Sequence, residues 1–496
     1  MASKNNDRFT VKSNIIPSAL VFLIAVLVYG QYGLEGKLFS DDAFMLYSGQ
    51  KFAEGVPPYV SSFFNIAPLG PMLMGMGVWF ANLMDTNDLM TVRIMFFLIS
   101  CLSAVFVYFL GRHLFQSIPA GLFSAFAFLG FFGYAERAAS GPRDKNVMVL
   151  FELLNLYLTC RKKWFWAGFF GSLAFLTWQP MAVFGLVTFI LACAQPRPLR
   201  LFALSRSLAG ITLPVILVLS YFQYHHALGA LIDGAVRFNL FYFPVTEQTI
   251  FRQVIAVFHG SGALLPVFGL LMMLCLYYGR FSVNASVRKT LLHDDFAPIL
   301  LSFPFPVIWS AFLDFRSYDD FFVFLPFVAL GFAILLNLAL RHGPALTDSV
   351  KQKRPDRLIT VGLCLTLISS AALTTRFNRH ADLVIQQRAA AEIERRFGRD
   401  ARLLAINVPQ VPVLLQQTNP SPFLYVFFNF DCWIDDHNPG GFDGWLAQME
   451  SFRPEVVVYS YNPCVHMDKL RHWLNAHYQP EQIGPWQVYV RNAPPD

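Results

Sequence analysis

The chain has 496 residues, of which 55% are hydrophobic and only 14% charged, and its mean hydropathy is +0.45. Soluble domains are about 25% charged, so this composition excludes a soluble globular protein and indicates a polytopic membrane protein. The formal net charge of +6 does not point to a nucleic-acid partner, because the basic residues gather in a few short loops, as in membrane proteins. We therefore expect membrane lipid, and no nucleic acid, around the chain.

The N-terminal stretch "MASKNNDRFTVK" is basic and leads into a full-length apolar run without a small-residue cleavage site. We expect a cytoplasmic start and not a cleaved signal peptide. Apolar runs of roughly 18 residues or more, the length that crosses the hydrocarbon core, recur along the chain. They predict about eleven transmembrane helices, at roughly 14–34, 91–112, 118–134, 145–160, 164–180, 182–195, 205–224, 258–279, 296–313, 321–340 and 357–375.

Basic loops determine the expected orientation of these helices. Four Lys/Arg-rich loops fall on one side of the membrane in this count, which makes that side cytoplasmic; they are 160–164, 195–200, 278–289 and 341–357. The other side then carries the first loop (35–90), the loops 136–145 and 313–320, and everything after about residue 376. This requires that 68–84 does not cross, and its Pro and Gly content suits a helix in the outer interface. We expect a multi-pass protein of the inner cell membrane.

After the last expected span, long apolar runs give way to amphipathic and strand-like patterns. This change predicts two domains: a transmembrane domain (1–376) and an extracytoplasmic α/β domain (377–496). An amphipathic helix at 381–398 opens the second domain. Strand-like stretches at 401–408, 423–428, 455–461 and 486–492 alternate with helical patterns at 442–452 and 466–478. Such alternation indicates a largely parallel sheet. This domain has no G-x-G-x-x-G motif, Walker loop or zinc spacing.

Two of the seven cysteines, Cys432 and Cys464, fall in the expected exported domain, where a disulfide persists once formed. A pair of free thiols is the open alternative. The other five cysteines lie in or at the ends of spans, where thiols behave as small hydrophobic side chains.

The charged residues of the membrane half collect at the outer ends of the expected spans. They are Asp41, Asp42, Glu136, Arg137, Arg143, Asp144, Lys145, Arg316, Asp319 and Asp320. Within the spans the obvious carboxylate is Glu152, and a carboxylate at mid-membrane costs about 2.5–3.5 kcal/mol, so we expect it to face a cavity or a partner. This one-sided arrangement favours a site at the outer face of the membrane.

Each charged motif also has a purely structural interpretation. Ser40 or Asp41 could cap the helix that follows, with Asp42 favoured by the helix dipole. The stretch "SGPRDK" could be a solvated turn with a structural Arg–Asp pair, and "YDD" could be an interfacial cap. The pair His225–His226 has no third ligand at metal spacing. No ligand spacing indicates a metal site, and a divalent cofactor stays open.

The stretch "SDDAFMLYSGQKFAEGVPPYVSSFFNIAPLGPML" resembles the first exported loop of the GT-C superfamily of membrane glycosyltransferases. The likeness lies in an acidic pair after the first span, an aromatic residue soon after it, a G-x-P-Y-like motif (Gly55, Pro58, Tyr59) and a Pro-Leu before an interfacial helix. "GPRDKNVMVLFELLNLYL" and "YDDFFVFLPFVALGFA" resemble the family's second exported loop and a late span, and "PWQVYVR" its C-terminal end. The chain departs from the family in having Asp-Asp where many relatives have Asp-Glu, and one extra residue between Gly55 and Tyr59.

The resemblance implies a GT-C fold and a polyprenyl-phosphate-sugar-dependent, protein-mannosyltransferase-like enzyme. Such an enzyme moves a hexose or pentose from the lipid carrier to a hydroxyl of a glycan, lipid or protein outside the cytoplasm, with inversion. The acceptor hydroxyl needs a general base, expected at Asp41 or Asp42. The carrier phosphate needs a cation, expected at Arg143, Arg316 or Arg137. Further substrate contacts are expected from Asp144, Tyr47, Tyr59, Glu152, Tyr318, Asp319 and Asp320.

The main alternative is a transporter or flippase of a lipid-linked saccharide. Such a protein places polar residues and broken helices near the bilayer midplane, often in repeated halves, whereas this sequence has only Glu152 there and no internal repeat. A non-catalytic assembly subunit is a third hypothesis.

Overall fold

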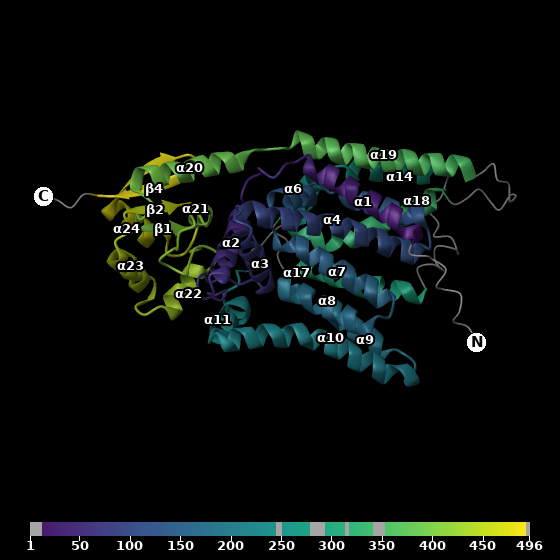
Figure 1. Ribbon diagram of the computed structural model, residues 1–496, viewed down its shortest axis with the longest axis horizontal. Coiled ribbons are helices and arrows are strands. Elements are labelled where there is room, and N and C mark those ends of the chain that lie inside the picture. The colour runs from purple at the N-terminus through teal and green to yellow at the C-terminus, as the bar shows by residue number, and fades with distance from the viewer. Residues whose placement is uncertain (1–11, 245–249, 278–292, 313–316, 341–352, 493–496) are drawn as a thin grey trace.

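The computed structural model describes residues 12–244, 250–277, 293–312, 317–340 and 353–492. Long helices run side by side in one elongated bundle, and a smaller domain that contains the sheet lies at one end of it (Figure 1). The bundle helices are α1 (Lys12–Gly30), α4 (Asp88–Phe115), α5 (Ile118–Leu129), α6 (Phe132–Ser140), α7 (Asp144–Cys160), α8 (Trp164–Thr177), α9 (Ala182–Cys193), α10 (Arg197–Tyr224), α13 (Ile250–Ser261), α14 (Leu264–Tyr277), α16 (Ala297–Ser302), α17 (Pro304–Phe312), α18 (Leu325–Leu340) and α19 (Lys353–Phe377).

Each of the eleven expected spans overlaps helical structure, but the helices differ in length. In the described part of the chain, four helical segments are long and apolar enough to cross a membrane, or up to six if each bent pair counts as one span. The bent pairs are α5 with α6, at 69°, and α13 with α14, at 95°. Side chains explain where helices begin: Asn87 accepts a hydrogen bond from Met90 N (2.9 Å) at the start of α4. The count of eleven stays a prediction.

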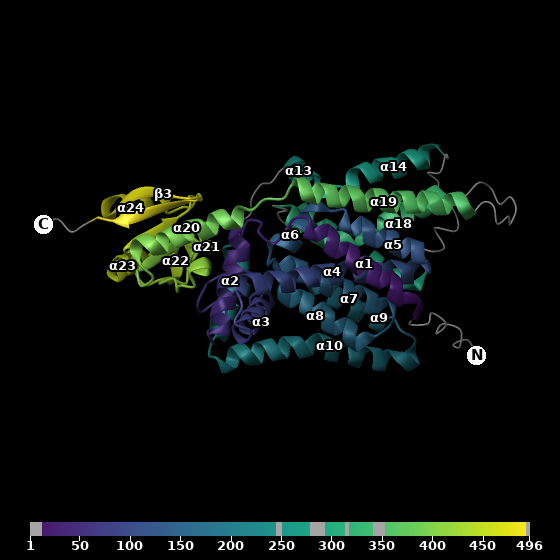
Figure 2. The same ribbon diagram turned by 45° about the horizontal axis from the view of Figure 1, so that its top comes forward.

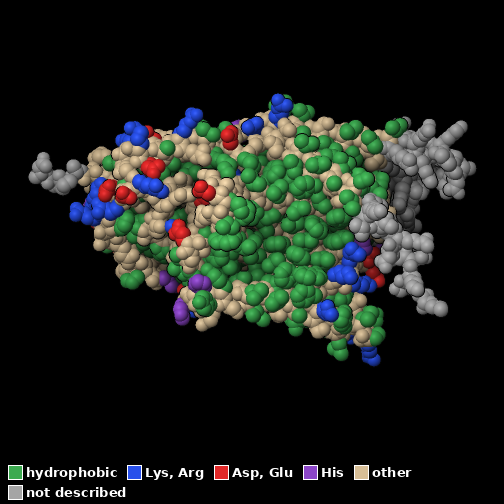
Figure 3. Space-filling model, in the orientation of Figure 1, with side chains coloured by type: hydrophobic (Ala, Val, Ile, Leu, Met, Phe, Trp, Pro, Cys, Tyr) green, Lys and Arg blue, Asp and Glu red, His purple; other side chains and the backbone are tan. Residues whose placement is uncertain are grey.

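Apolar side chains cover the outside of the bundle. In the space-filling view, hydrophobic side chains form a broad continuous area over the bundle helices, with charged side chains mainly over the C-terminal domain and at the opposite end (Figure 3). Many large apolar residues of α10 are exposed, among them Leu201, Leu213, Ile216 and Leu217. An apolar surface of this extent is expected of helices that face lipid. The chain is therefore a multi-pass membrane protein.

The expected first exported loop contains two helices, α2 (Ser40–Ala53) and α3 (Leu69–Leu83). Both views place them at the end of the bundle, across the direction of its long helices and next to the C-terminal domain (Figures 1 and 2). One face of α3 exposes Met76, Trp79, Phe80 and Leu83. The expectation that 68–84 does not cross the membrane and lies in the outer interface stays a prediction, with which this position is compatible.

The C-terminal domain is a four-stranded sheet with helices on both faces. The strands are β1 (Leu403–Ile406), β2 (Val456–Tyr459), β3 (Tyr478–Ile483) and β4 (Trp486–Arg491), and their order is β1-β2-β4-β3. The helices α20 (Asp382–Phe397) and α21 (Gln410–Leu415) pack on one face. The other face is covered by α22 (Phe430–His437), α23 (Gly441–Phe452) and α24 (Met467–His477). The boundary expected at residue 376 falls where α19 ends, next to α20.

Two expectations about this domain are wrong. The sheet is mixed and not largely parallel, because only β1 and β2 are parallel, while β4 is antiparallel to both β2 and β3. The stretch 423–428 is not a strand: the Asn407 side chain accepts from Val426 N (3.0 Å), and Phe428 and Asn429 have positive φ angles of 63° and 64°, which end any extended run. The two cysteines of this domain, Cys432 and Cys464, are free thiols in the structure, so their pairing stays a prediction.

Candidate active site

A cavity of about 640 Å³ lies where the bundle end, α2 and the C-terminal domain meet. Its polar lining is concentrated in a few side chains, and aromatic rings make up much of the remaining wall. The charged lining residues are Asp41, Arg143, Asp144, Lys145 and Asp320, and the aromatic ones are Phe44, Phe64, Trp178, Phe243, Trp309, Tyr425, Phe427, Phe428 and Phe430. Such a combination of apolar walls with a few convergent polar groups is typical of a small-molecule site.

The acidic pair opens α2. Asp41 and Asp42 lie in the first turn of this helix, where the positive end of the helix dipole favours carboxylates. The N-cap residue is Phe39, without a side-chain cap hydrogen bond, so the interpretation of Ser40 or Asp41 as a capping residue is wrong. The two carboxylates differ in access: the Asp41 side chain is 55% exposed and lines the cavity, whereas Asp42 is fully buried.

Arg143 joins the acidic pair to two other segments. It directly precedes α7, and its Nη1 atom lies 3.0 Å from Asp41 Oδ2 and 3.4 Å from Asp42 Oδ1. Its Nη2 atom lies 3.2 Å from Asp319 Oδ2, and its Nε atom lies 3.7 Å from Asp144 Oδ1. The planar fork of arginine suits several carboxylates at once. Arg143 is therefore the centre of the charged cluster.

A second arginine supports this cluster from behind. Arg137, on α6, donates from Nε to Asp319 Oδ1 at 3.0 Å, and its Nη1 atom lies 3.7 Å from Asp42 Oδ2. Its guanidinium is 3.5 Å from the centre of the Phe39 ring. Arg137 does not line the cavity. Arg137 therefore positions Asp42 and Asp319, whereas Arg143, which lines the cavity, is the arginine that a bound substrate would contact.

Lys145 is a third cation of the site, and no role is predicted for it from the sequence. Its ammonium pairs with Asp320 and lies 4.9 Å from the centre of the Trp178 ring, and it lines the cavity. Asp320 also accepts from Ser317 N at 3.1 Å in a capping box at the start of η4 (Tyr318–Phe324). Asp320 therefore acts as a helix cap, as the structural interpretation of "YDD" predicts, and it also lines the cavity.

Burial shifts the pKa of the hidden carboxylate, Asp42. Burial raises the pKa of Asp42 to about 7, against the lowering effect of Arg137 and Arg143. Burial by itself lowers the pKa of Arg143, but Asp319, Asp41 and Asp42 outweigh it and hold the pKa above its usual range. At neutral pH the cluster therefore keeps its cation, while the buried carboxylate of Asp42 takes up a proton far more readily than an exposed aspartate does.

Four of the expected site residues lie elsewhere in the structure. The Tyr47 hydroxyl accepts from Asn419 N at 3.0 Å, which links α2 to the C-terminal domain. The Tyr59 hydroxyl donates to Ile66 O at 2.6 Å and its ring stacks on Phe64, so it shapes the loop between α2 and α3.

Glu152 is buried in α7 and has no hydrogen-bond partner among the described residues, and Tyr318 donates to Glu136. None of these four side chains lines the cavity. Arg316 lies outside the described residues. Of the expected residues, the cavity therefore collects Asp41, Arg143, Asp144 and Asp320.

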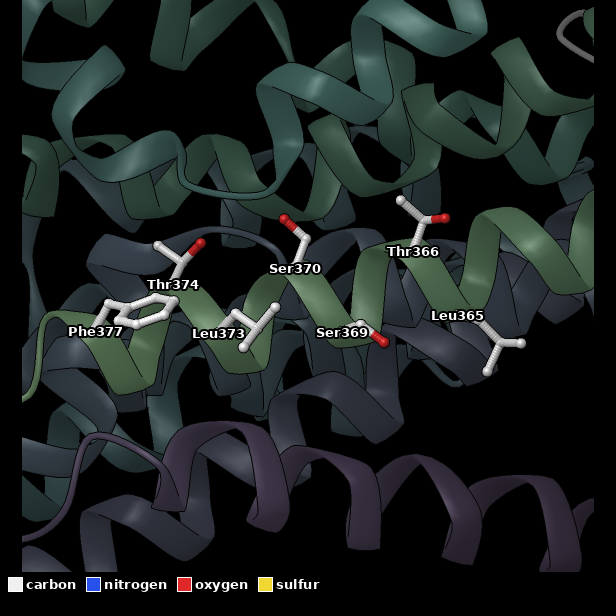
Figure 4. A pocket seen from close by; sticks show the side chains of 7 residues that line it. All are labelled: Leu365, Thr366, Ser369, Ser370, Leu373, Thr374 and Phe377. Carbon is white, nitrogen blue, oxygen red and sulfur yellow. The ribbon is translucent and has the colours of Figure 1, made fainter.

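A second hollow, of about 610 Å³, runs along α19 and differs in character (Figure 4). All seven of its lining residues belong to this one helix, and its polar groups are hydroxyls such as those of Thr366, Ser370 and Thr374. None of its described lining residues is charged, so these residues offer neither a base nor a cation. Among the described residues, no group of three or more His, Cys, Asp or Glu side chains is arranged to hold a metal ion.

Comparison with known proteins supports the fold assignment. No protein-family profile and no curated sequence matches the chain. The structure is similar to that of ArnT from Cupriavidus metallidurans bound to undecaprenyl phosphate, with a TM-score of 0.59 and 12% identity over 98% of this chain and 99% of that chain. The apo state of the same ArnT gives the same TM-score over 97% of this chain and 99% of that chain.

A third similar structure is the archaeal oligosaccharyltransferase AglB from Archaeoglobus fulgidus, in complex with an inhibitory peptide and a dolichol-phosphate. Its TM-score is 0.52 and its identity 11%, over 98% of this chain and 75% of that chain. ArnT and AglB are both GT-C proteins. The chain therefore has the GT-C fold, as the resemblance of its exported loops predicts, and at this identity the likeness concerns the fold alone.

Proposed function

We propose that the protein is a glycosyltransferase that moves a sugar from a polyprenyl-phosphate carrier to a hydroxyl of an extracytoplasmic glycan, lipid or protein. The observation that carries the proposal is the cavity wall on which an accessible carboxylate, Asp41, lies 3.0 Å from the buried cation Arg143. Two structures of similar fold, ArnT and AglB, contain undecaprenyl phosphate and a dolichol-phosphate, which are carriers of the expected kind.

Asp41 is the general base in this proposal. A base must come within hydrogen-bond reach of the hydroxyl proton that it removes. Asp41 lines the cavity, whereas Asp42 has no exposed surface. Asp42 therefore serves to hold Arg143 and Arg137 in position, and the choice between the two carboxylates falls on Asp41.

The reaction is a single displacement at the anomeric carbon. Asp41 takes the proton of the acceptor hydroxyl, and the acceptor oxygen forms the new bond to the anomeric carbon from the face opposite the phosphate. The bond between that carbon and the phosphate oxygen breaks, and the electron pair leaves with the polyprenyl phosphate. This displacement inverts the anomeric configuration, and the charge that develops on the phosphate needs a positioned cation.

Lys145 and Arg143 are the cations that we assign to the carrier phosphate. Both line the cavity, and a Lys ammonium binds phosphate as a point charge. Arg143 is already shared among carboxylates, of which Asp41, Asp42 and Asp319 lie within 3.0 to 3.4 Å. Among the described residues, Lys145 forms an ion pair with one carboxylate, Asp320, which itself faces the cavity. A phosphate that binds Lys145 would therefore disrupt fewer ion pairs than one that binds Arg143.

The position of the cavity favours this chemistry over transport. The cavity lies at the end of the bundle, between α2, the start of α7 and the C-terminal domain, and not midway along the helices. A carrier can keep its tail among the apolar helices while its headgroup reacts in this cavity. We place this end outside the cytoplasm, in the inner cell membrane, because the Lys/Arg-rich loops that the structure describes, 160–164 and 195–200, lie at the other end.

The proposal is tested with membranes that contain the wild-type protein or Asp41→Asn, supplied with a panel of radiolabelled polyprenyl-phosphate sugars. We expect transfer of at least one sugar by the wild type and a loss of about 100-fold or more in Asp41→Asn, because a positioned base contributes about 10²–10⁴-fold. Asp400→Asn, which removes an exposed carboxylate of the C-terminal domain, is the matched control. Full activity of Asp41→Asn would overturn the assignment.

A further inference from the structure

The C-terminal domain contributes a buried tyrosine to the cavity. Tyr425 is 7% exposed, lines the cavity, and stacks its ring on Phe44 of α2, with centroids 4.6 Å apart and planes at 15°. Its hydroxyl donates to Asp41 Oδ1 at 3.5 Å. The two oxygens of Asp41 therefore have different partners: Arg143 on Oδ2 and Tyr425 on Oδ1.

The segment that carries Tyr425 is held on both sides. Towards the sheet, Asn407 follows β1 and binds the segment twice: its N–H donates to Leu424 O (2.7 Å) and its side chain accepts from Val426 N (3.0 Å). Towards the membrane domain, Phe63 N donates to Pro422 O at 2.8 Å. Stacking of Phe238 on Phe430, with centroids 4.5 Å apart, adds apolar contact across the same junction. The hydroxyl of Tyr425 is consequently fixed relative to α2.

We propose that Tyr425 is a positioning residue for Asp41, so that the C-terminal domain completes the active site of the membrane domain. This inference rests on the proposed function, since it assigns Tyr425 a role through the base. Without the Tyr425 hydroxyl, the exposed Asp41 side chain would be held through Oδ2 alone, by Arg143. Each carboxylate oxygen has about two acceptor sites, so Oδ1 keeps one for the incoming hydroxyl. A long hydrogen bond of this kind tightens when substrate excludes water.

Burial supports the donor role of the hydroxyl. Burial raises the pKa of Tyr425 above its usual range, and the neighbouring Asp41 raises it further, so the O–H stays protonated. Phe427 and Phe428 continue the wall next to Tyr425. The loss of the Tyr425 ring would therefore affect binding, whereas the loss of its hydroxyl alone would affect the geometry of the base.

The experiment compares Tyr425→Phe with the wild type under steady-state conditions, on the sugar that the wild type transfers. Tyr425→Phe keeps the ring on Phe44 and removes the donor to a carboxylate, so we expect kcat to fall about tenfold, with KM for donor and acceptor within about twofold of the wild type. Tyr461→Phe, a change at an exposed tyrosine of the same domain, is the matched control. An unchanged kcat, or a rise in KM at constant kcat, would overturn the inference.

A double-mutant cycle keeps the test independent of folding defects. If Tyr425 acts through Asp41, then Tyr425→Phe has no further effect on the residual activity of Asp41→Asn, although it slows the wild type. Equal effects in both backgrounds would mean that Tyr425 acts elsewhere and would refute the inference. A wild-type protein that transfers none of the sugars refutes the proposed function itself, which is a different result from an active wild type that Tyr425→Phe leaves unchanged.

Discussion

The substitution Asp42→Asn tests the electrostatics of the site through its effect on stability. Asp42 is fully buried, and its pKa of about 7 in the folded protein compares with about 3.9 in an unfolded chain. A pKa that is higher in the folded state contributes stability that is complete below pH 4 and is lost as the pH rises through 7. The difference between the two pKa values corresponds to on the order of 4 kcal/mol between these limits.

Asparagine has nearly the same shape as aspartate and does not ionise in this range. The free energy of unfolding of Asp42→Asn relative to the wild type should therefore rise between pH 4 and pH 8. The measurement is thermal unfolding of the purified protein in detergent, followed by tryptophan fluorescence at several pH values, with Asp400→Asn as the control at an exposed carboxylate. We expect the melting temperature of Asp42→Asn minus that of the wild type to increase by a few degrees from pH 4 to pH 8. A gap that is constant, or that shrinks as the pH rises, would refute the reasoning.

Three further predictions follow from the same cluster and its position. Arg143→Lys keeps one charge but cannot span Asp41, Asp42 and Asp319, so we expect kcat to fall about 100-fold and thermal stability to drop. The control Arg402→Lys, at an exposed ion pair, should change neither quantity. Wild-type kinetics of Arg143→Lys would contradict this prediction. Lys145→Gln should raise KM for the donor about tenfold with KM for the acceptor little changed, and an equal rise in both constants would argue against a phosphate-binding role. Two single cysteines test the orientation in a variant without other reactive thiols: Ser451→Cys in the C-terminal domain and Lys162→Cys in the loop between α7 and α8. An impermeant thiol reagent added to intact cells should label only Ser451→Cys. Labelling of Lys162→Cys alone would place the cavity on the cytoplasmic side.

The membrane half of the fold and the location of the site follow from local features of the sequence. Apolar runs of sufficient length lie where the structure has helices, and charges that are costly in lipid fall at the ends of those runs. Asp41 at the start of α2 and Arg143 at the start of α7 were therefore expected at the same end of the bundle, and the structure places them 3.0 Å apart.

The pairing of the charges depends on contacts that the sequence does not encode locally. The hydrogen bond between Arg137 and Asp319 joins residues 182 positions apart, and packing of α6 against η4 determines it. Likewise, Asp41 and Asp42 have the same chemistry in sequence, and only the burial of one of them separates their roles.

Tyr425 was missed for another reason. The apolar, aromatic-rich stretch 423–428 is typical of a strand, and the side chain of Asn407 overrides that preference. The contact of Tyr425 with Asp41, 384 positions away, arises only when the two domains dock. The strand β3 was also missed, because "YQPEQI" has polar residues and a proline on an edge strand.

The central claim is that Asp41 drives an inverting transfer from a polyprenyl-phosphate sugar. The most direct test incubates purified protein with such a donor of known anomeric configuration and an acceptor, and measures both the released polyprenyl phosphate and the configuration of the product. We predict one polyprenyl phosphate released per sugar transferred, inversion at the anomeric carbon, and a rate at least about 100-fold lower for Asp41→Asn. Retention of configuration, or an undiminished rate for Asp41→Asn, would contradict the account.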